Sequence, residues 1–97
     1  MEFSLDDIVL GDNPEAGRFE ATLDGALMAE AQYERTGNQI TFTHTIVAEA
    51  AEGQGVGGKL VKFALDQART EDLVVIPQCP FVHSYLRRHP EYEDLVR

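Results

Sequence analysis

The chain has 97 residues, with 17 acidic and 8 basic side chains and a formal net charge of -9 at pH 7. This length fits a single domain, residues 1–97, with a modest core, and it excludes a full dinucleotide-binding domain or an ordinary P-loop enzyme. The acidic balance argues against a nucleic-acid partner, whose phosphates need a basic face, and suits a solvated surface or basic partners.

The N-terminal segment MEFSLDDIVL has neither a basic n-region nor a long apolar core, so it predicts neither a signal peptide nor a membrane span. Cys79 is the only cysteine and can form no disulfide within the chain, which suits a reducing compartment. We therefore expect a cytoplasmic protein that has no membrane partner.

Residues 8–48 have the pattern of four antiparallel strands. The segment IVL precedes the turn-rich GDNPEAG, and RFEATL and ALMAEAQYE flank the hairpin dipeptide Asp24-Gly25. The last of these strands, ITFTHTIV, follows the glycine-bearing turn RTGNQ.

The spacing of apolar residues changes after residue 54. It predicts an amphipathic helix from Gly55 to Thr70, and the short β-branched run LVVIP then predicts a strand from Leu73 to Ile76. This order implies that Thr41–Val47 lies parallel to Leu73–Ile76, with a right-handed crossover. A second helix is expected from Pro80 to His89, ahead of Pro90, and the tail EYEDLVR is expected to be a frayed turn.

The glycine-rich stretch EGQGVGGKL stands where a strand gives way to a helix. A helix N-terminus offers unpaired backbone N–H groups and a positive dipole end, so this stretch predicts an anion site, and four glycines in six residues exceed what a turn requires. A Walker A loop needs Ser or Thr after its lysine, whereas Leu60 follows Lys59. A dinucleotide fold needs an acidic residue at the end of the next strand, where this chain has IPQC.

Cys79 and His83, together with His44 or His89, could be taken as ligands of a zinc site, but their pattern does not favour one. Structural zinc sites use paired ligands at close spacing, and this chain has one thiol. We therefore predict no metal.

Three segments together resemble the GNAT superfamily of acetyl-CoA-dependent N-acetyltransferases, in particular a small single-domain branch in which a strand ends in Cys-Pro. They are FTHTIV, EGQGVGGKLV and VIPQCPFVHSYLRRHPEY. The resemblance implies an α/β (α+β) fold with a mixed, mostly antiparallel sheet, a splayed parallel strand pair and two helices. Glu52 departs from the family loop, which has Arg or Gln at this position, and this lowers the expected CoA affinity. The chain also lacks room for the helices that usually wall the acceptor site.

The resemblance implies acetyl-CoA as co-substrate and an amine acceptor, either a small molecule or a protein lysine. The pantetheine arm would bind backbone groups of two residues on the first parallel strand, Ile46 and Val47. The pyrophosphate would bind the loop and helix start, namely Gly53, Gln54, Gly55, Val56, Gly57, Gly58 and Lys59. Two alternatives stay open, a CoA-binding module without efficient turnover and an interaction domain that keeps only the fold. The oligomeric state also stays open.

Three residues are candidates for catalysis. Cys79 ends the second parallel strand before a helix N-terminus, a position that favours an exposed, reactive thiol, as nucleophile or as tunnel wall. His44 alternates with Phe42 and Ile46, so we expect it on the apolar face, as general base, as partner of Cys79 or as a core residue. Tyr85 is expected to protonate the CoA thiolate or to pack in the core.

Arg87 and Arg88 follow on the same predicted helix. They are candidates for contacts with the CoA phosphates, or they favour the C-terminal end of their helix.

Overall fold

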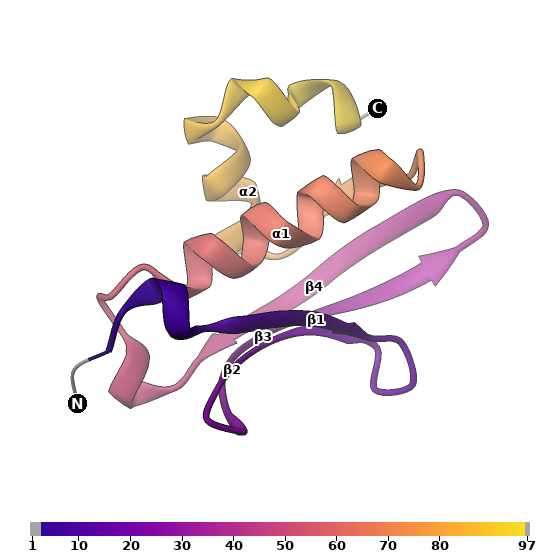
Figure 1. Ribbon diagram of the computed structural model, residues 1–97. Helices are drawn as coiled ribbons and strands as arrows, with labels where there is room; N and C mark the ends of the chain where they lie inside the picture. Colours follow the sequence, from indigo (N-terminus) through magenta and orange to yellow (C-terminus); the bar gives the residue numbers. More distant parts are fainter. Residues whose placement is uncertain (1–2, 97) are drawn as a thin grey trace.

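The computed structural model describes residues 3–96. Its strands are β1 (Val9–Asn13), β2 (Arg18–Leu23), β3 (Ala26–Thr36), β4 (Gln39–Val47) and β5 (Val74–Pro77). Its helices are α1 (Val56–Thr70) and α2 (Pro80–Arg88), with short 3-10 helices η1 (Leu5–Asp7), η2 (Glu49–Ala51) and η3 (Pro90–Leu95). Figure 1 shows α1 lying across one face of the sheet.

The sheet has five strands in the order β1-β2-β3-β4-β5, with antiparallel pairs up to β4 and a parallel β4–β5 pair. This confirms the predicted mixed sheet. Asp24 (φ 50) and Gly25 (φ 83) both occupy the left-handed region, as a two-residue hairpin turn requires. β1 continues into the expected turn, because Gly11–Asn13 pairs with Arg18–Glu20.

The β4–β5 pairing uses an earlier part of β4 than the Thr41–Val47 segment that the sequence predicted. It joins Gln39–Phe42 to Val74–Pro77, and the backbone N–H of Cys79 then donates to the carbonyl of Phe42 at 2.9 Å. Within the described chain, β4 continues past this point without a strand on that side. We call the space between the diverging ends of the two strands the wedge.

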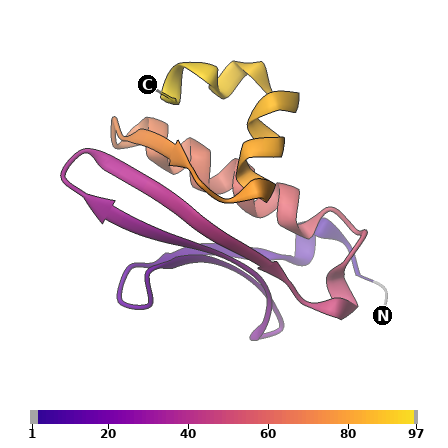
Figure 2. The ribbon, with the colours of Figure 1, turned by 180° about the vertical axis from the view of Figure 1, so that it is seen from behind.

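Both α-helices lie on the same side of the sheet, which leaves the opposite side of β1–β4 without a helix among the described residues (Figure 2). We call this opposite side the open face. The core lies between the sheet and α1, where Leu60, Val61 and Leu65 are at most 1% exposed. Burial of each such side chain contributes about 1.5–3 kcal/mol.

The tail forms η3 up to Leu95, which corrects the expected frayed turn. In η3, Tyr92 and Leu95 are buried, and the Tyr92 hydroxyl donates to Asp66 Oδ1 on α1 at 2.5 Å. Arg69 Nη1 lies 2.8 Å from Asp94 Oδ2. These contacts to α1 outweigh the chain-end entropy that favours fraying.

Within residues 3–96 no helix is both long and apolar enough to span a membrane.

Candidate functional site

The glycine-rich loop ends at the start of α1. Gly55 is the N-cap residue and has φ 85, a conformation that favours glycine, and no side chain caps this helix end. The first intrahelical bond is donated by the N–H of Lys59 to Gly55, so the N–H groups of Val56, Gly57 and Gly58 precede the helical ladder. No acidic residue lies in the first turn, and the helix end therefore suits an anion.

A pocket of about 390 Å³ connects this helix end to β4. We call it the glycine-loop pocket; its walls include Thr45, Val47, Glu52, Gly55, Gly57, Gly58 and Phe81. Gly57 is closely packed here, because a Cβ atom at its position would lie 2.8 Å from Phe81 Cζ and 3.1 Å from Val47 Cγ2. Glycine at this position therefore lets β4 and α2 approach the helix start.

The polar side chains of the loop make local contacts. Gln54 Nε2 donates to the carbonyl of Ala50 at 2.9 Å, and Lys59 Nζ donates to the carbonyl of Leu5 at 2.5 Å. Lys59 thus ties η1 to the start of α1. Glu52 is exposed and lines the pocket, so its expected effect on anion affinity stays a prediction.

A β-bulge in β4 decides which residues reach this pocket. Tyr33 pairs with Phe42 and Gln32 with His44, so Thr43 is an extra residue that reverses the side-chain alternation beyond it. Thr45 and Val47 consequently line the glycine-loop pocket on the helix side.

The same bulge determines the backbone groups at the wedge. The N–H of Ala48 bonds to Met28 on β3, and strand alternation then directs the N–H and C=O groups of Thr45 and Val47 away from β3, toward the wedge. The backbone groups of Val47 therefore face the wedge, and its role as a partner of the pantetheine arm stays a prediction. Ile46 does not: it pairs with Glu30 of β3, and its side chain is 53% exposed on the open face.

The expectation that His44 points to the apolar face is wrong. His44 is exposed and lies in the same cross-strand row as Gln32 and Arg18, on the open face. The bulge at Thr43 is the physical reason, since one extra residue moves every later side chain to the other face. His44 and Cys79 are therefore on different sides of β4 and do not form a pair.

Cys79 lies at the base of the wedge as the N-cap residue of α2. It is only 2% exposed, which corrects the expectation of an exposed sulfur. Its Sγ lies 3.3 Å from Thr45 Oγ1, and this hydroxyl is the polar neighbour that the sequence did not reveal. No sequence signal identifies Thr45, because the bulge places it there.

Tyr85 and Phe81 lie one turn apart on α2, facing the start of α1. A Cβ at Gly58 would be 3.9 Å from Tyr85 Cε2, and the Tyr85 ring stacks on His89 with centroids 3.9 Å apart. Its hydroxyl makes no hydrogen bond to another described residue and is not fully enclosed. Burial raises the pKa of Tyr85 above its ordinary value of 10, so the phenol stays protonated to a higher pH than a free tyrosine.

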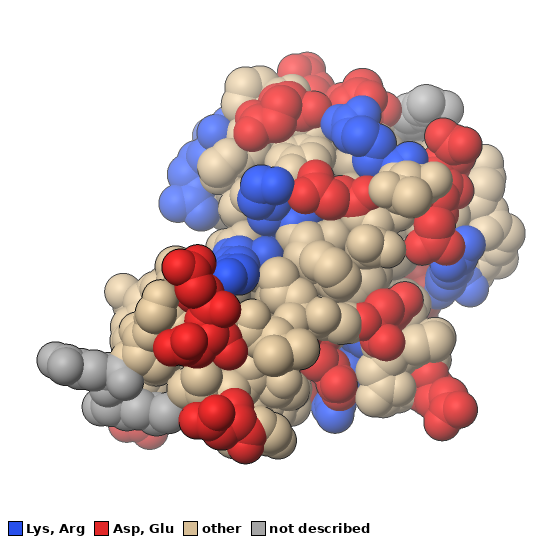
Figure 3. All heavy atoms as spheres, viewed as in Figure 1, with Lys and Arg blue, Asp and Glu red and all other residues tan. Residues whose placement is uncertain are grey.

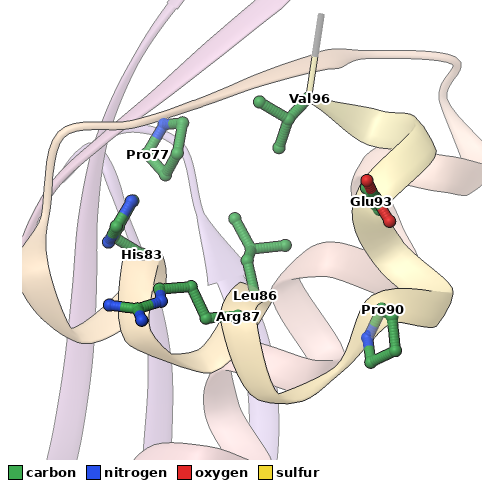
Figure 4. A pocket seen from close by; sticks show the side chains of 7 residues that line it. All are labelled: Pro77, His83, Leu86, Arg87, Pro90, Glu93 and Val96. Atoms are coloured by element: carbon green, nitrogen blue, oxygen red, sulfur yellow. The ribbon is translucent and has the colours of Figure 1, made fainter.

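Arg87 lies in a different hollow. This hollow of about 390 Å³ lies between α2, η3 and the end of β5, and Figure 4 shows His83, Leu86 and Arg87 on one side of it and Glu93 and Val96 on the other. It shares no lining residue with the glycine-loop pocket.

Within the described residues, no cluster of three His, Cys, Asp or Glu side chains is arranged to hold a metal ion. Acidic and basic side chains are interspersed over the side of the molecule shown in Figure 3.

Comparisons with known proteins agree with this geometry. The family model described as GCN5-related N-acetyl-transferase matches residues 18–95. The mouse protein NATD1 is 35% identical over 66 residues, which are 67% of this chain and 60% of the mouse protein. The matched segment therefore spans less than two thirds of that relative.

Solved structures show the same fold. The solution structure of a GCN5-like protein from Staphylococcus aureus superimposes with a TM-score of 0.72 and 28% identity, covering 94% of this chain and 89% of that chain. A ribosomal-protein-alanine N-acetyltransferase from Brucella melitensis biovar Abortus has a TM-score of 0.57 and 18% identity, over 82% of this chain and 62% of that chain.

Proposed function

Because the chain belongs to the GCN5-related N-acetyltransferase family, we propose that it transfers an acetyl group from acetyl-CoA to an amine. One observation carries this proposal. A single pocket joins the uncapped N-terminus of α1 to the unpaired side of β4, so it offers an anion site and a strand edge together. A pyrophosphate with an amide-bearing arm requires both.

The residues fit acetyl-CoA in two places. The N–H groups of Val56, Gly57 and Gly58 would bind the pyrophosphate, because Gly57 and Gly58 have no side chain to block it. Backbone groups of Thr45 and Val47 would bind the pantetheine amides in the way that an added strand is bound.

The chemistry assigns a role to each side of the wedge. A backbone N–H of Thr45 or Val47 polarises the thioester carbonyl. His44 takes a proton from the acceptor nitrogen as that nitrogen bonds to the acetyl carbon and the C–S bond breaks. Tyr85, as a neutral phenol, donates a proton to the departing thiolate. We favour direct attack over an acetyl-Cys79 intermediate, because the buried sulfur is next to Thr45 and is 2% exposed.

The acceptor is a small-molecule amine or a protein lysine. A CoA-binding module without efficient turnover is the second candidate function, and the exposure of His44 favours it, because an exposed imidazole leaves a reacting amine in contact with water.

A titration of acetyl-CoA by calorimetry tests the binding part. Gly58→Asp places a carboxylate at the third helical position, where it favours the helix but repels phosphate. We expect the affinity to fall by about tenfold or more, with thermal stability kept or raised. Gly58→Asn is the matched control, because it adds the same volume without the charge.

Turnover is tested by following free thiol release with a panel of amines. If acetyl-CoA binds but neither amine transfer nor hydrolysis rises above background, the binding module replaces the enzyme. Tighter binding of ATP or NADH than of acetyl-CoA would contradict the choice of ligand itself.

A further inference from the structure

A second pocket lies on the open face, beside the same stretch of β4. It has a volume of about 340 Å³, and its walls include Arg18, Glu30, Gln32, Glu34, Thr43 and His44. We call it the open-face pocket. Both pockets have the size of small-molecule sites, which are about 300–1,000 Å³.

Neighbouring residues of β4 line two different pockets. Thr43 and His44 line the open-face pocket, and Thr45 and Val47 line the glycine-loop pocket. These residues follow Phe42, where pairing with β5 ends, and the two pockets lie on opposite faces of this part of β4. A group held in the open-face pocket therefore lies beside His44, the base of the proposed acetyl transfer.

Glu30 is a charged residue that lines the open-face pocket. It is 9% exposed although no helix covers this side of the sheet within the described chain, and its carboxylate accepts from Arg18 Nη1 at 2.9 Å and from Gln32 Nε2 at 2.6 Å. Arg18 also bonds to Glu20 at 2.7 Å, so two carboxylates share one guanidinium.

The acidic side chains in and around this pocket outnumber its basic ones. Arg18 is the cation among its lining residues, and it is already shared by Glu20 and Glu30, while Glu34 adds a further exposed carboxylate. A ligand that brings a positive charge improves this balance, and a ligand that brings a carboxylate worsens it.

We propose that the open-face pocket is the acceptor site and that it selects primary amines that carry a second positive charge. This inference rests on the proposed acetyl transfer. The reacting nitrogen loses its proton to His44 and bonds to the acetyl carbon, and the C–S bond breaks. The second ammonium keeps its charge throughout and lies against Glu30 and Glu34.

An NMR titration tests the pocket independently of acetyl-CoA. The probes are cadaverine, pentylamine and delta-aminovalerate, which share chain length and one primary amine but differ in the charge at the other end. We expect cadaverine to shift the side-chain resonances of Arg18, Gln32 and His44 and to bind about tenfold more tightly than pentylamine, the effect of one partly screened charge contact. Equal binding by all three probes, or no shift at these residues, would overturn the proposal.

Glu30→Gln is the variant to compare with the native chain. Arg18 keeps its bond to Glu20, so the sheet is expected to fold, and the preference for cadaverine should fall by about tenfold. Glu71→Gln is the matched control, because it removes the same charge from an exposed ion pair with Arg35, and its preference should be unchanged. If Glu30→Gln does not fold, Glu34→Gln provides the same comparison at an exposed position.

Steady-state kinetics then separate this proposal from the proposed function. If the native enzyme acetylates pentylamine, delta-aminovalerate and cadaverine at equal rates, the proposed acetyl transfer stands and the proposed selectivity is contradicted. If the native chain binds cadaverine in the open-face pocket but does not bind acetyl-CoA, the assignment of the pocket stands and the proposed acetyl transfer is contradicted. Peptides with lysine beside arginine, compared with cadaverine, show whether the preferred amine comes from a protein or a small molecule.

Discussion

Thr45 Oγ1 lies 3.3 Å from Cys79 Sγ, across the point where β4 and β5 diverge. The contact connects the wall of the glycine-loop pocket with the base of the wedge, because Thr45 lines that pocket and Cys79 is buried behind it. The thiol is thus adjacent to the proposed path of the pantetheine arm but has little access to it.

Cys79→Ala should therefore keep most of the acetyl transfer activity, with a loss of less than about tenfold, because backbone groups supply the main stabilisation of the reacting carbonyl. Intact mass measured with acetyl-CoA and no acceptor should show no acetyl group on the native protein. An adduct on Cys79 that forms and decays as fast as product appears would establish the covalent route instead.

Tyr85→Phe should lower kcat by about tenfold or more while the fold is kept, since the hydroxyl makes no hydrogen bond to another described residue. The sign of the pKa shift sets the pH dependence. A raised pKa keeps the phenol protonated at and below its ordinary value of 10, so the native enzyme loses this acid only at higher pH. A pH profile in which the native and Phe enzymes have equal kcat would assign Tyr85 to packing.

Gly57→Ala should destabilise the protein by about 1–3 kcal/mol, because the new Cβ would lie 2.8 Å from Phe81 Cζ. Gly58→Ala is its neighbour control. Its Cβ would have a contact of 3.9 Å, so we expect stability to be unchanged or raised by up to about 1 kcal/mol. Urea unfolding of both variants measures the difference, and equal stabilities would show that α2 shifts to accommodate the methyl group.

Tyr92→Phe should lower the free energy of unfolding by about 1 kcal/mol at pH 7, because the hydroxyl donates to the Asp66 carboxylate. Burial of Asp66 raises its pKa, but the bonds from Tyr92 and Lys62 outweigh burial and hold that pKa below 3.8. A depressed carboxylate pKa contributes stability that is present above pH 3.8 and is lost as the pH falls through the lower, folded value.

The difference between Tyr92→Phe and the native protein should therefore shrink in acid. Urea unfolding at pH 7 and at pH 3 measures it. A difference that is the same at both pH values would mean that the ionised carboxylate contributes nothing through this bond.

Local sequence determined much of this fold because its signals act over a few residues. Asp24-Gly25 adopts positive φ at both positions and fixes the β2–β3 hairpin, and Gly55 ends the loop and starts α1 as predicted. The glycines at the start of α1, which leave the first helical N–H groups uncovered, could also be recognised from the sequence, since the absence of side chains is a property of the sequence itself.

Tertiary structure decided which side chains meet at the site. The extra residue Thr43 arises from the register of β4 against β3, and it moves His44 to the open face and Thr45 to Cys79. A strand alternates with a period of two, so one inserted residue exchanges its faces, and no local pattern in THTIV marks where this occurs. The burial of Cys79 and the docking of the tail through Tyr92 likewise depend on partners far away in the sequence, so they form only when the chain packs.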